Sequence, residues 1–183
     1  MLKDAIDLST LHHVLVVKLR HLGDVLLTSP VFTVLKNHAP QLEIDALVYR
    51  DTEPMLSGHP AIANVFTIDR GWKQQEWSSR LMHEWRLLRS LRARHYDLII
   101  HLTENARGAM LCLLLKPPYS VARDYPAKRG RVWRNSFTHL YPSPDRRHTV
   151  EMHLDALRRI GIQPRGDERR LTLVPGAEAE RSV

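Results

Sequence analysis

Short runs of aliphatic and β-branched residues alternate along the chain with longer segments in which apolar residues recur every three or four positions. The short runs predict strands and the longer segments predict helices. Strands are expected at residues 14–18, 44–48, 65–68, 98–101 and 119–122, with a sixth at 170–174. Strands that alternate with helices are typical of a parallel sheet covered by helices, so the pattern predicts an α/β fold.

The most regular helical pattern covers residues 76–94, where the apolar positions are Trp77, Leu81, Trp85, Leu88 and Leu91. This spacing predicts an amphipathic helix with a basic outer face. Further helices are expected at residues 24–37, 105–115 and 148–160. Pro30 either occupies a first helical turn after Ser29 or kinks the first of these helices. Gly161 is a stop signal for the last one.

The length and the charge balance limit the possible functions. The chain has 183 residues, 43% of them apolar, which is enough for one domain with one sizeable core. Lys and Arg outnumber Asp and Glu by 27 to 20, so the formal charge is +7 and anionic partners are favoured. Nucleic acid, acidic lipid and phosphorylated saccharide all fit this charge.

Cysteine usage and hydropathy indicate a protein that stays in the cytoplasm. Cys112 is the only cysteine and stands among apolar residues, so it is expected to be a small buried side chain. The first ten residues contain Asp4 and Asp7 and lack the pattern of a secretory signal. The longest apolar run, residues 109–115, is far shorter than the ~20 residues of a transmembrane helix. Any contact with a membrane is therefore expected to be peripheral.

Strand-to-helix turns are the expected sites of chemistry, because ligands of open α/β sheets bind beyond the carboxyl ends of the strands. The first turn, residues 18–24, joins a basic cluster to Gly23 and the carboxylate of Asp24. By itself Asp24 could be only a helix N-terminal charge that the helix dipole stabilises. One glycine does not make the three-glycine dinucleotide fingerprint, so the turn does not indicate an NAD-dependent enzyme.

Residues 16–30, Val-Val-Lys-Leu-Arg-His-Leu-Gly-Asp-Val-Leu-Leu-Thr-Ser-Pro, resemble the opening motif of glycosyltransferase family 9. Residues 31–40, 96–100 and 102–108 resemble most closely the lipopolysaccharide core heptosyltransferases of the third type, and the likeness runs from Leu11 to the end. The resemblance implies inverting transfer of heptose from ADP-heptose to a hydroxyl of the lipopolysaccharide core. It also implies two Rossmann-like domains of the GT-B plan that face a cleft, each with helices on both faces of a parallel sheet.

The resemblance assigns roles to individual residues. Asp24 matches the family's catalytic base, and a carboxylate near the acceptor hydroxyl suits that chemistry. Arginine and lysine can hold acidic sugar or phosphate. The candidate acceptor-binding residues are Lys18, Arg20, Arg70, Lys73, Arg107, Arg123 and His148. Each of these also has a plain structural alternative, such as a strand end, a solvated loop or a helix cap.

The segment from Val121 to Arg147 is basic and aromatic. Its seven Lys and Arg and two Asp give 7 − 2 = +5, interleaved with Tyr125, Trp133, Phe137 and Tyr141. Composition alone allows a nucleic-acid surface, a lipid-facing loop or a saccharide-binding loop. In the family this part approaches the acceptor and the membrane, so a peripheral position at the cytoplasmic face of the inner membrane is expected.

The chain departs from the family pattern in three ways. Met152 stands where a basic residue commonly follows the glutamate, and Glu104 stands where glycine is more common. Family members are roughly twice as long, with a second domain that supplies most contacts to the donor. We therefore interpret residues 1–174 as the amino-terminal, acceptor-side domain and residues 175–183 as a truncated linker, with the donor-binding domain absent.

Two functions from different classes remain open. The chain is either the acceptor-binding half of a heptosyltransferase, inactive alone, or a non-catalytic module that binds anionic core saccharide. A nucleic-acid-binding domain is a weaker third possibility that the Asp24 motif does not support, and no nucleic-acid partner is expected. The histidine spacing suits no metal site, and neither a metal nor a cofactor is predicted.

Overall fold

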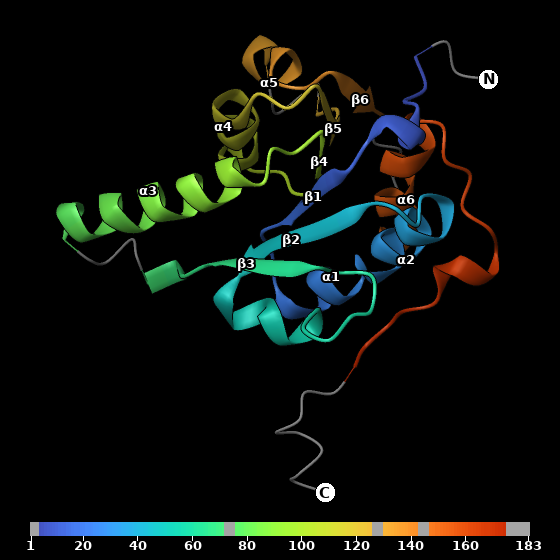
Figure 1. Cartoon of the computed structure of the whole chain (residues 1–183), viewed down its shortest axis with the longest axis horizontal. Helices are drawn as coiled ribbons and strands as arrows, with labels where there is room; N and C mark the ends of the chain where they lie inside the picture. The colour runs from blue at the N-terminus through green and yellow to red at the C-terminus, as the bar shows by residue number, and fades with distance from the viewer. Residues whose placement is uncertain (1–3, 72–75, 126–129, 143–146, 175–183) are drawn as a thin grey trace, which may run out of the picture.

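The computed structural model of the chain describes residues 4–71, 76–125, 130–142 and 147–174. Within them, six parallel strands form one sheet in the order β3-β2-β1-β4-β5-β6. The strands are β1 (His13–Lys18), β2 (Glu43–Tyr49), β3 (Asn64–Ile68), β4 (Leu98–His101), β5 (Tyr119–Arg123) and β6 (His139–Tyr141). Figure 1 shows the sheet with helices on either side. The predicted α/β fold is confirmed.

Strand β1 lies at the centre of the sheet and is buried on both faces. Val14 and Val16 point into one hydrophobic core, which α2 (Ser29–His38) and α6 (Thr149–Arg159) cover. Leu15 and Val17 point into a second core, which α4 (Ala106–Leu115), α5 (Arg131–Asn135) and the end of α3 (Trp77–Ala93) cover. Burial on both faces explains why this strand is a continuous apolar run rather than an alternating one.

Five of the six predicted strands are confirmed, and one is wrong. Residues 170–174 are irregular, and Leu171 and Leu173 are exposed. This segment instead donates a hydrogen bond from Thr172 N–H to Ser29 Oγ at 3.0 Å. The sheet ends with β6, which was not predicted because three residues carry too little periodic signal.

The helix predicted at residues 24–37 is two helices, α1 (Leu22–Leu26) and α2. The break precedes Pro30, which occupies the first turn of α2, where its missing N–H costs nothing. The short helix α5 was not predicted. The other helices follow the predicted segments, with Asn105 capping α4 and Gly161 at φ +102° after α6. The described residues also form three short 3-10 turns: η1 (Leu8–Thr10), η2 (Arg50–Met55) and η4 (Asp167–Arg169).

Helix α3 forms where it was predicted, but much of its apolar side does not pack on the core. Its buried residues are Leu87 and Leu91, both in the carboxyl-terminal half. Trp77, Leu81 and Trp85 are exposed by 78%, 57% and 54%. Figure 1 shows the amino-terminal half of α3 projecting away from the rest of the domain. No helix among the described residues is long and apolar enough to cross a membrane.

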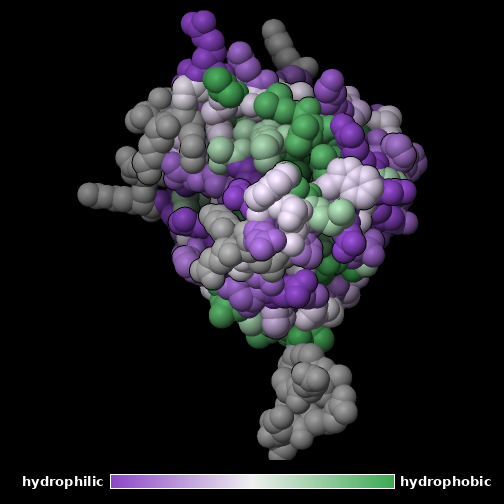
Figure 2. Space-filling view, turned by 90° about the vertical axis from the view of Figure 1, so that its left-hand side faces the viewer, coloured by the Kyte–Doolittle hydropathy of each residue, from purple (hydrophilic) through white to green (hydrophobic). Residues whose placement is uncertain are grey.

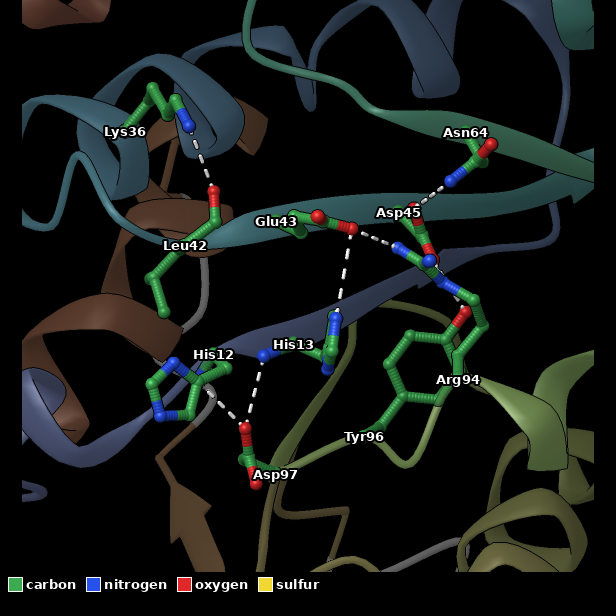
Figure 3. A network of polar contacts seen from close by, with 10 residues as sticks. All are labelled: His12, His13, Lys36, Leu42, Glu43, Asp45, Asn64, Arg94, Tyr96 and Asp97. Carbon is green, nitrogen blue, oxygen red and sulfur yellow. Dashed lines mark hydrogen bonds and ion pairs between the residues drawn. The ribbon is translucent and has the colours of Figure 1, made fainter.

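A buried carboxylate ties the amino-terminal part of the sheet together (Figure 3). Asp45 of β2 is fully buried, and its Oδ2 accepts hydrogen bonds from Arg94 Nε and the Tyr96 hydroxyl, both at 2.8 Å. Its Oδ1 accepts from Asn64 Nδ2 of β3 at 2.9 Å. Burial and the neighbouring Asp45 raise the pKa of Tyr96, so this hydroxyl remains a donor. Asp97, next to Tyr96, accepts the backbone N–H groups of the residues that begin β1.

We expect Asp45→Ala to destabilise the domain by about 3–5 kcal/mol, because it leaves Arg94, Tyr96 and Asn64 without their buried acceptor. Urea denaturation followed by far-ultraviolet circular dichroism would measure the change in the free energy of unfolding. Asp167→Ala removes an exposed carboxylate and serves as the control. Similar midpoints for the two variants would contradict the role of the Asp45 network.

Candidate active site

The turn after β1 is joined to the turn after β4 at the carboxyl edge of the sheet. Leu19 N–H donates to Thr103 Oγ1 at 2.8 Å. Helix α1 begins at Leu22, so Asp24 lies in its first turn, with its side chain 31% exposed. Arg20 Nε lies 3.7 Å from Asp24 Oδ2. Asp24 is therefore a partly accessible carboxylate beside a cation, placed where ligands of open α/β sheets bind.

Lys18, the last residue of β1, is buried rather than presented to solvent. Its Nζ donates to Leu102 O at 3.1 Å and contacts His153 Nε2 at 2.8 Å. Burial lowers the pKa of Lys18 to about 8; the charge of Asp24 opposes this shift and the charges of Arg20 and Arg123 add to it. Lys18 thus acts at this site as a fixed charge beneath Asp24 and the two arginines.

His153 of α6 contacts the buried side chain of Lys18. The sequence alone did not indicate His153 as a site residue. Its Nδ1 lies 3.0 Å from Leu27 O, so the tautomer that fits donates from Nδ1 and accepts the Lys18 hydrogen bond at Nε2. Burial, followed by the charge of Lys18, holds the pKa of His153 well below its usual range. Because the contact with Lys18 spans 135 residues, no local pattern could reveal it.

Arg123 ends β5 near the same turn. Its guanidinium lies 5.2 Å from the ring centroid of Tyr125, and its carbonyl accepts the Trp133 indole N–H at 3.0 Å. The buried Nε has no hydrogen-bond acceptor among the described residues. Burial raises the pKa of Tyr125, with the charge of Arg123 opposing that rise. Arg123 therefore brings an unused donor close to the charges around Asp24.

Arg70 and Arg107 both line a small pocket of about 200 Å³, which is separate from the group around Asp24. Arg70 donates to Arg20 O at 3.0 Å, lies 3.4 Å from Asp51 and stacks over the Tyr49 ring at 4.2 Å. Arg107 forms a two-point ion pair with Glu84 of α3. The pocket is lined by Tyr49, Ile68, Asp69, Arg70, Arg80, Glu84 and Arg107.

Gly108 sets the position of Arg107. A methyl group on Gly108 would overlap the ring of His101, the buried last residue of β4. Only glycine therefore lets the first turn of α4 approach the end of β4 so closely. This close approach is what brings Arg107 to the carboxyl edge of the sheet.

Two candidate acceptor-binding residues remain, His148 and Lys73. His148 is exposed and caps α6, accepting the Val150 N–H at its Nδ1 at 3.3 Å. Glu151 is held by Arg158 and Arg169 at 2.7 and 2.6 Å. Lys73 lies outside the described residues. Among the described residues, no group of His, Cys, Asp and Glu has an arrangement that could hold a metal ion.

The curated proteins that this chain resembles are lipopolysaccharide heptosyltransferases. No protein-family model matches the chain. It is 38% identical over 144 residues to lipopolysaccharide heptosyltransferase 3 of Escherichia coli, a match that covers 79% of the chain and 42% of the relative. It is 28% identical over 140 residues to lipopolysaccharide heptosyltransferase 1 of Pseudomonas aeruginosa, covering 75% of the chain and 39% of the relative. The chain therefore spans less than half the length of the curated relatives it matches.

Solved structures share the fold. The glycosyl transferase family 9 protein of Veillonella parvula has a TM-score of 0.71 at 24% identity, covering 88% of this chain and 44% of that one. Escherichia coli heptosyltransferase WaaC with ADP-2-deoxy-2-fluoro heptose has a TM-score of 0.73 at 22% identity, covering 84% of this chain and 50% of that one. The Rossmann-like sheet predicted from the resemblance is thus the fold of these proteins.

The neutral, buried His153 makes stability depend on pH. Its pKa is lower in the folded than in the unfolded state, so the unfolded state binds the extra proton and stability falls as the pH decreases below about 6.5. Between pH 6.5 and pH 5, protonation of this one group in the unfolded state lowers the free energy of unfolding by about 2 kcal/mol, at roughly 1.4 kcal/mol per pH unit. We expect His153→Gln to flatten this decline in urea denaturation measured at several pH values.

The exposed His12, replaced by glutamine, controls for the loss of a histidine as such. An equally steep decline in His153→Gln and in the parent protein would show that His153 takes up its proton without unfolding.

Proposed function

We propose that the chain belongs to the lipopolysaccharide heptosyltransferases of glycosyltransferase family 9 and that it supplies the acceptor side of a heptosyl transfer reaction. The donor would be ADP-heptose and the acceptor a hydroxyl of the lipopolysaccharide core. The observation that carries this proposal is Asp24, a partly accessible carboxylate among fixed cations at the carboxyl edge of the sheet.

Asp24 would act as the general base. Its carboxylate takes the proton of the acceptor hydroxyl, the hydroxyl oxygen bonds to the anomeric carbon of heptose, and the bond from that carbon to the phosphate oxygen breaks. ADP leaves with the bonding electron pair, and the configuration inverts. Arg20 lies beside the carboxylate, and the buried Lys18 holds a positive charge below it, so the site presents positive potential to the phosphorylated substrates.

The two arginine groups would hold the anionic acceptor. The buried Nε of Arg123 has no acceptor among the described residues, as expected of a donor that hydrogen-bonds to a ligand when one is bound. Arg70 and Arg107 line the neighbouring pocket, and Arg70 is linked to the Asp24 turn through the carbonyl of Arg20. His148 would offer only its other ring nitrogen to the acceptor, because its Nδ1 already caps α6.

Most donor contacts would come from the part of the relatives that this chain does not match. We propose that residues 1–174 correspond to the amino-terminal domain of the relatives and bind acceptor without turnover, because a base without a held donor gives no reactive pair. The protein would act in the cytoplasm, in peripheral contact with the inner membrane. A non-catalytic module that binds anionic core saccharide is the second candidate, because Arg70 and Arg107 line a pocket that can hold an anion whether or not Asp24 acts as a base.

Asp24→Asn should lower turnover by about two to four orders of magnitude while acceptor affinity stays nearly constant, since the amide keeps the shape and cannot accept the proton. Heptose transfer would be measured with the chain joined to the carboxyl-terminal part of Escherichia coli heptosyltransferase 3, with calorimetry for acceptor binding. Asp167→Asn is the control for loss of an exposed carboxylate. Turnover near that of the parent would exclude Asp24 as the base, and a joined protein that binds acceptor without any turnover would favour the second candidate.

Arg123→Gln and Arg70→Gln should weaken binding of phosphorylated acceptor by about 10- to 100-fold each, because a charge-assisted hydrogen bond contributes about 1.5–3 kcal/mol. Binding of the dephosphorylated acceptor should change much less. Titration calorimetry of both ligands with the isolated chain would measure the difference, and Arg165→Gln, at an exposed position away from these groups, is the control. Equal losses for the two ligands would remove the phosphate contact from the proposal.

A further inference from the structure

A long apolar groove of about 870 Å³ runs between α3 and α4. Its apolar lining comes mainly from Trp77, Leu81, Trp85, Leu88, Met110 and Leu114. These residues recur at helical spacing on two neighbouring helices, so they form a continuous surface rather than scattered positions. The core of the domain leaves this surface uncovered, as only the carboxyl-terminal half of α3 is buried.

The groove is unusual for its exposed indoles. Trp77 and Trp85 are exposed by 78% and 54%, and Leu113, next to the groove on α4, by 53%. Figure 2 views the molecule from the side on which α3 projects and shows hydrophobic residues gathered on this face, with hydrophilic residues around them. Contiguous apolar surfaces of this kind mark places where a partner or a membrane binds.

The charges around the groove identify the kind of partner. Helix α3 contains four arginines and one glutamate, and that glutamate, Glu84, is already bound by Arg107. Arg89 lies over the Trp85 ring at 5.3 Å, and Arg92 donates to Leu114 O at 3.1 Å. The exposed apolar surface therefore has a positive rim. A second copy of the chain would bring two positive rims together, whereas an anionic surface matches the rim.

The groove also adjoins the proposed acceptor pocket. Tyr49, Arg80, Glu84 and Arg107 line both the groove and the small pocket of Arg70. A lipid-linked saccharide could therefore reach the arginines of the pocket while its lipid end stays at the groove.

We propose that the amino-terminal half of α3, together with the exposed face of α4, is the surface by which this protein docks on an anionic lipid bilayer. Trp77, Leu81 and Trp85 enter the boundary between head groups and acyl chains, and Arg86 and Arg89 face lipid phosphates. Tryptophan and arginine in this arrangement are typical of helices that lie in the membrane interface. The proposal rests on the proposed function only in that the acceptor is carried by a membrane.

The test is co-sedimentation of the isolated chain with vesicles of phosphatidylcholine mixed equally with phosphatidylglycerol, beside vesicles of phosphatidylcholine alone. We expect binding to the anionic vesicles, a shift of indole emission to shorter wavelength and quenching by brominated acyl chains. Trp77→Ser, Leu81→Gln and Trp85→Ser combined should lower partitioning by about tenfold or more. These side chains are exposed, so folding should be retained, and circular dichroism would check it.

Two matched controls separate this surface from general effects. Leu171→Gln with Leu173→Gln removes exposed apolar residues elsewhere and should leave partitioning unchanged. Arg86→Gln with Arg89→Gln should weaken binding to anionic vesicles, while Arg165→Gln with Arg170→Gln, at exposed positions away from α3, should weaken it less.

Absence of vesicle binding would overturn the proposal. So would equal binding by the variant that combines the Trp77, Leu81 and Trp85 substitutions and by the Leu171 and Leu173 control. So would a dimer in light scattering that the groove substitutions dissociate, because that result would assign the groove to a second copy. None of these measurements uses turnover or the core acceptor. Failure here therefore leaves the Asp24 and arginine predictions standing, and failure of those leaves the membrane surface standing.

Discussion

The buried carboxylate of Asp45 is the interaction on which the arrangement of this domain most depends. It fixes β2 to β3 through Asn64, and it holds Arg94 and Tyr96 at the junction between α3 and β4. A fully buried charge is tolerated only where hydrogen bonds and an opposite charge replace the lost water, and here all three donors are present. Because Arg94 directly follows α3, this helix is anchored at its carboxyl-terminal end. Its amino-terminal half is then free to extend past the sheet with its indoles exposed.

The amino ends and the carboxyl ends of the strands therefore differ in their polar contacts. Towards the amino ends of the strands, Asp45 accepts hydrogen bonds from neighbouring side chains, and Asp97 accepts them from backbone N–H groups. At the carboxyl ends, Arg20 lies beside Asp24, and the charges of Asp24, Arg20 and Arg123 all act on the buried Lys18. Burial, with smaller contributions from the charges of Arg20 and Arg123, lowers the pKa of Lys18, so holding this cation inside the domain costs stability. Such concentrated positive charge suits phosphorylated substrates.

The proposed acceptor site and the proposed membrane surface share one structural origin. Helices α3 and α4 approach each other through the Arg107 and Glu84 ion pair, and Gly108 lets α4 lie against the end of β4. Arg107 and Glu84 line both the pocket of Arg70 and the apolar groove. Neighbouring surfaces of α3 and α4 would therefore bind the membrane and the anionic saccharide.

The sequence by itself determined the α/β fold, five strands, the position of α3 and the turn that presents Asp24, because hydrophobic period and turn residues act over short distances. The family resemblance added the candidate roles of the charged residues, which the fold alone does not test. Only the tertiary structure decided that Lys18 is buried against His153, that Arg70 and Arg107 share a pocket apart from Arg123, and that the apolar side of α3 stays uncovered. The strand expected at residues 170–174 did not form, and β6, already too short to carry a periodic signal, was missed, because pairing with a sheet edge also depends on which segments meet in space. These outcomes depend on contacts between residues far apart in the chain, and no local pattern encodes them.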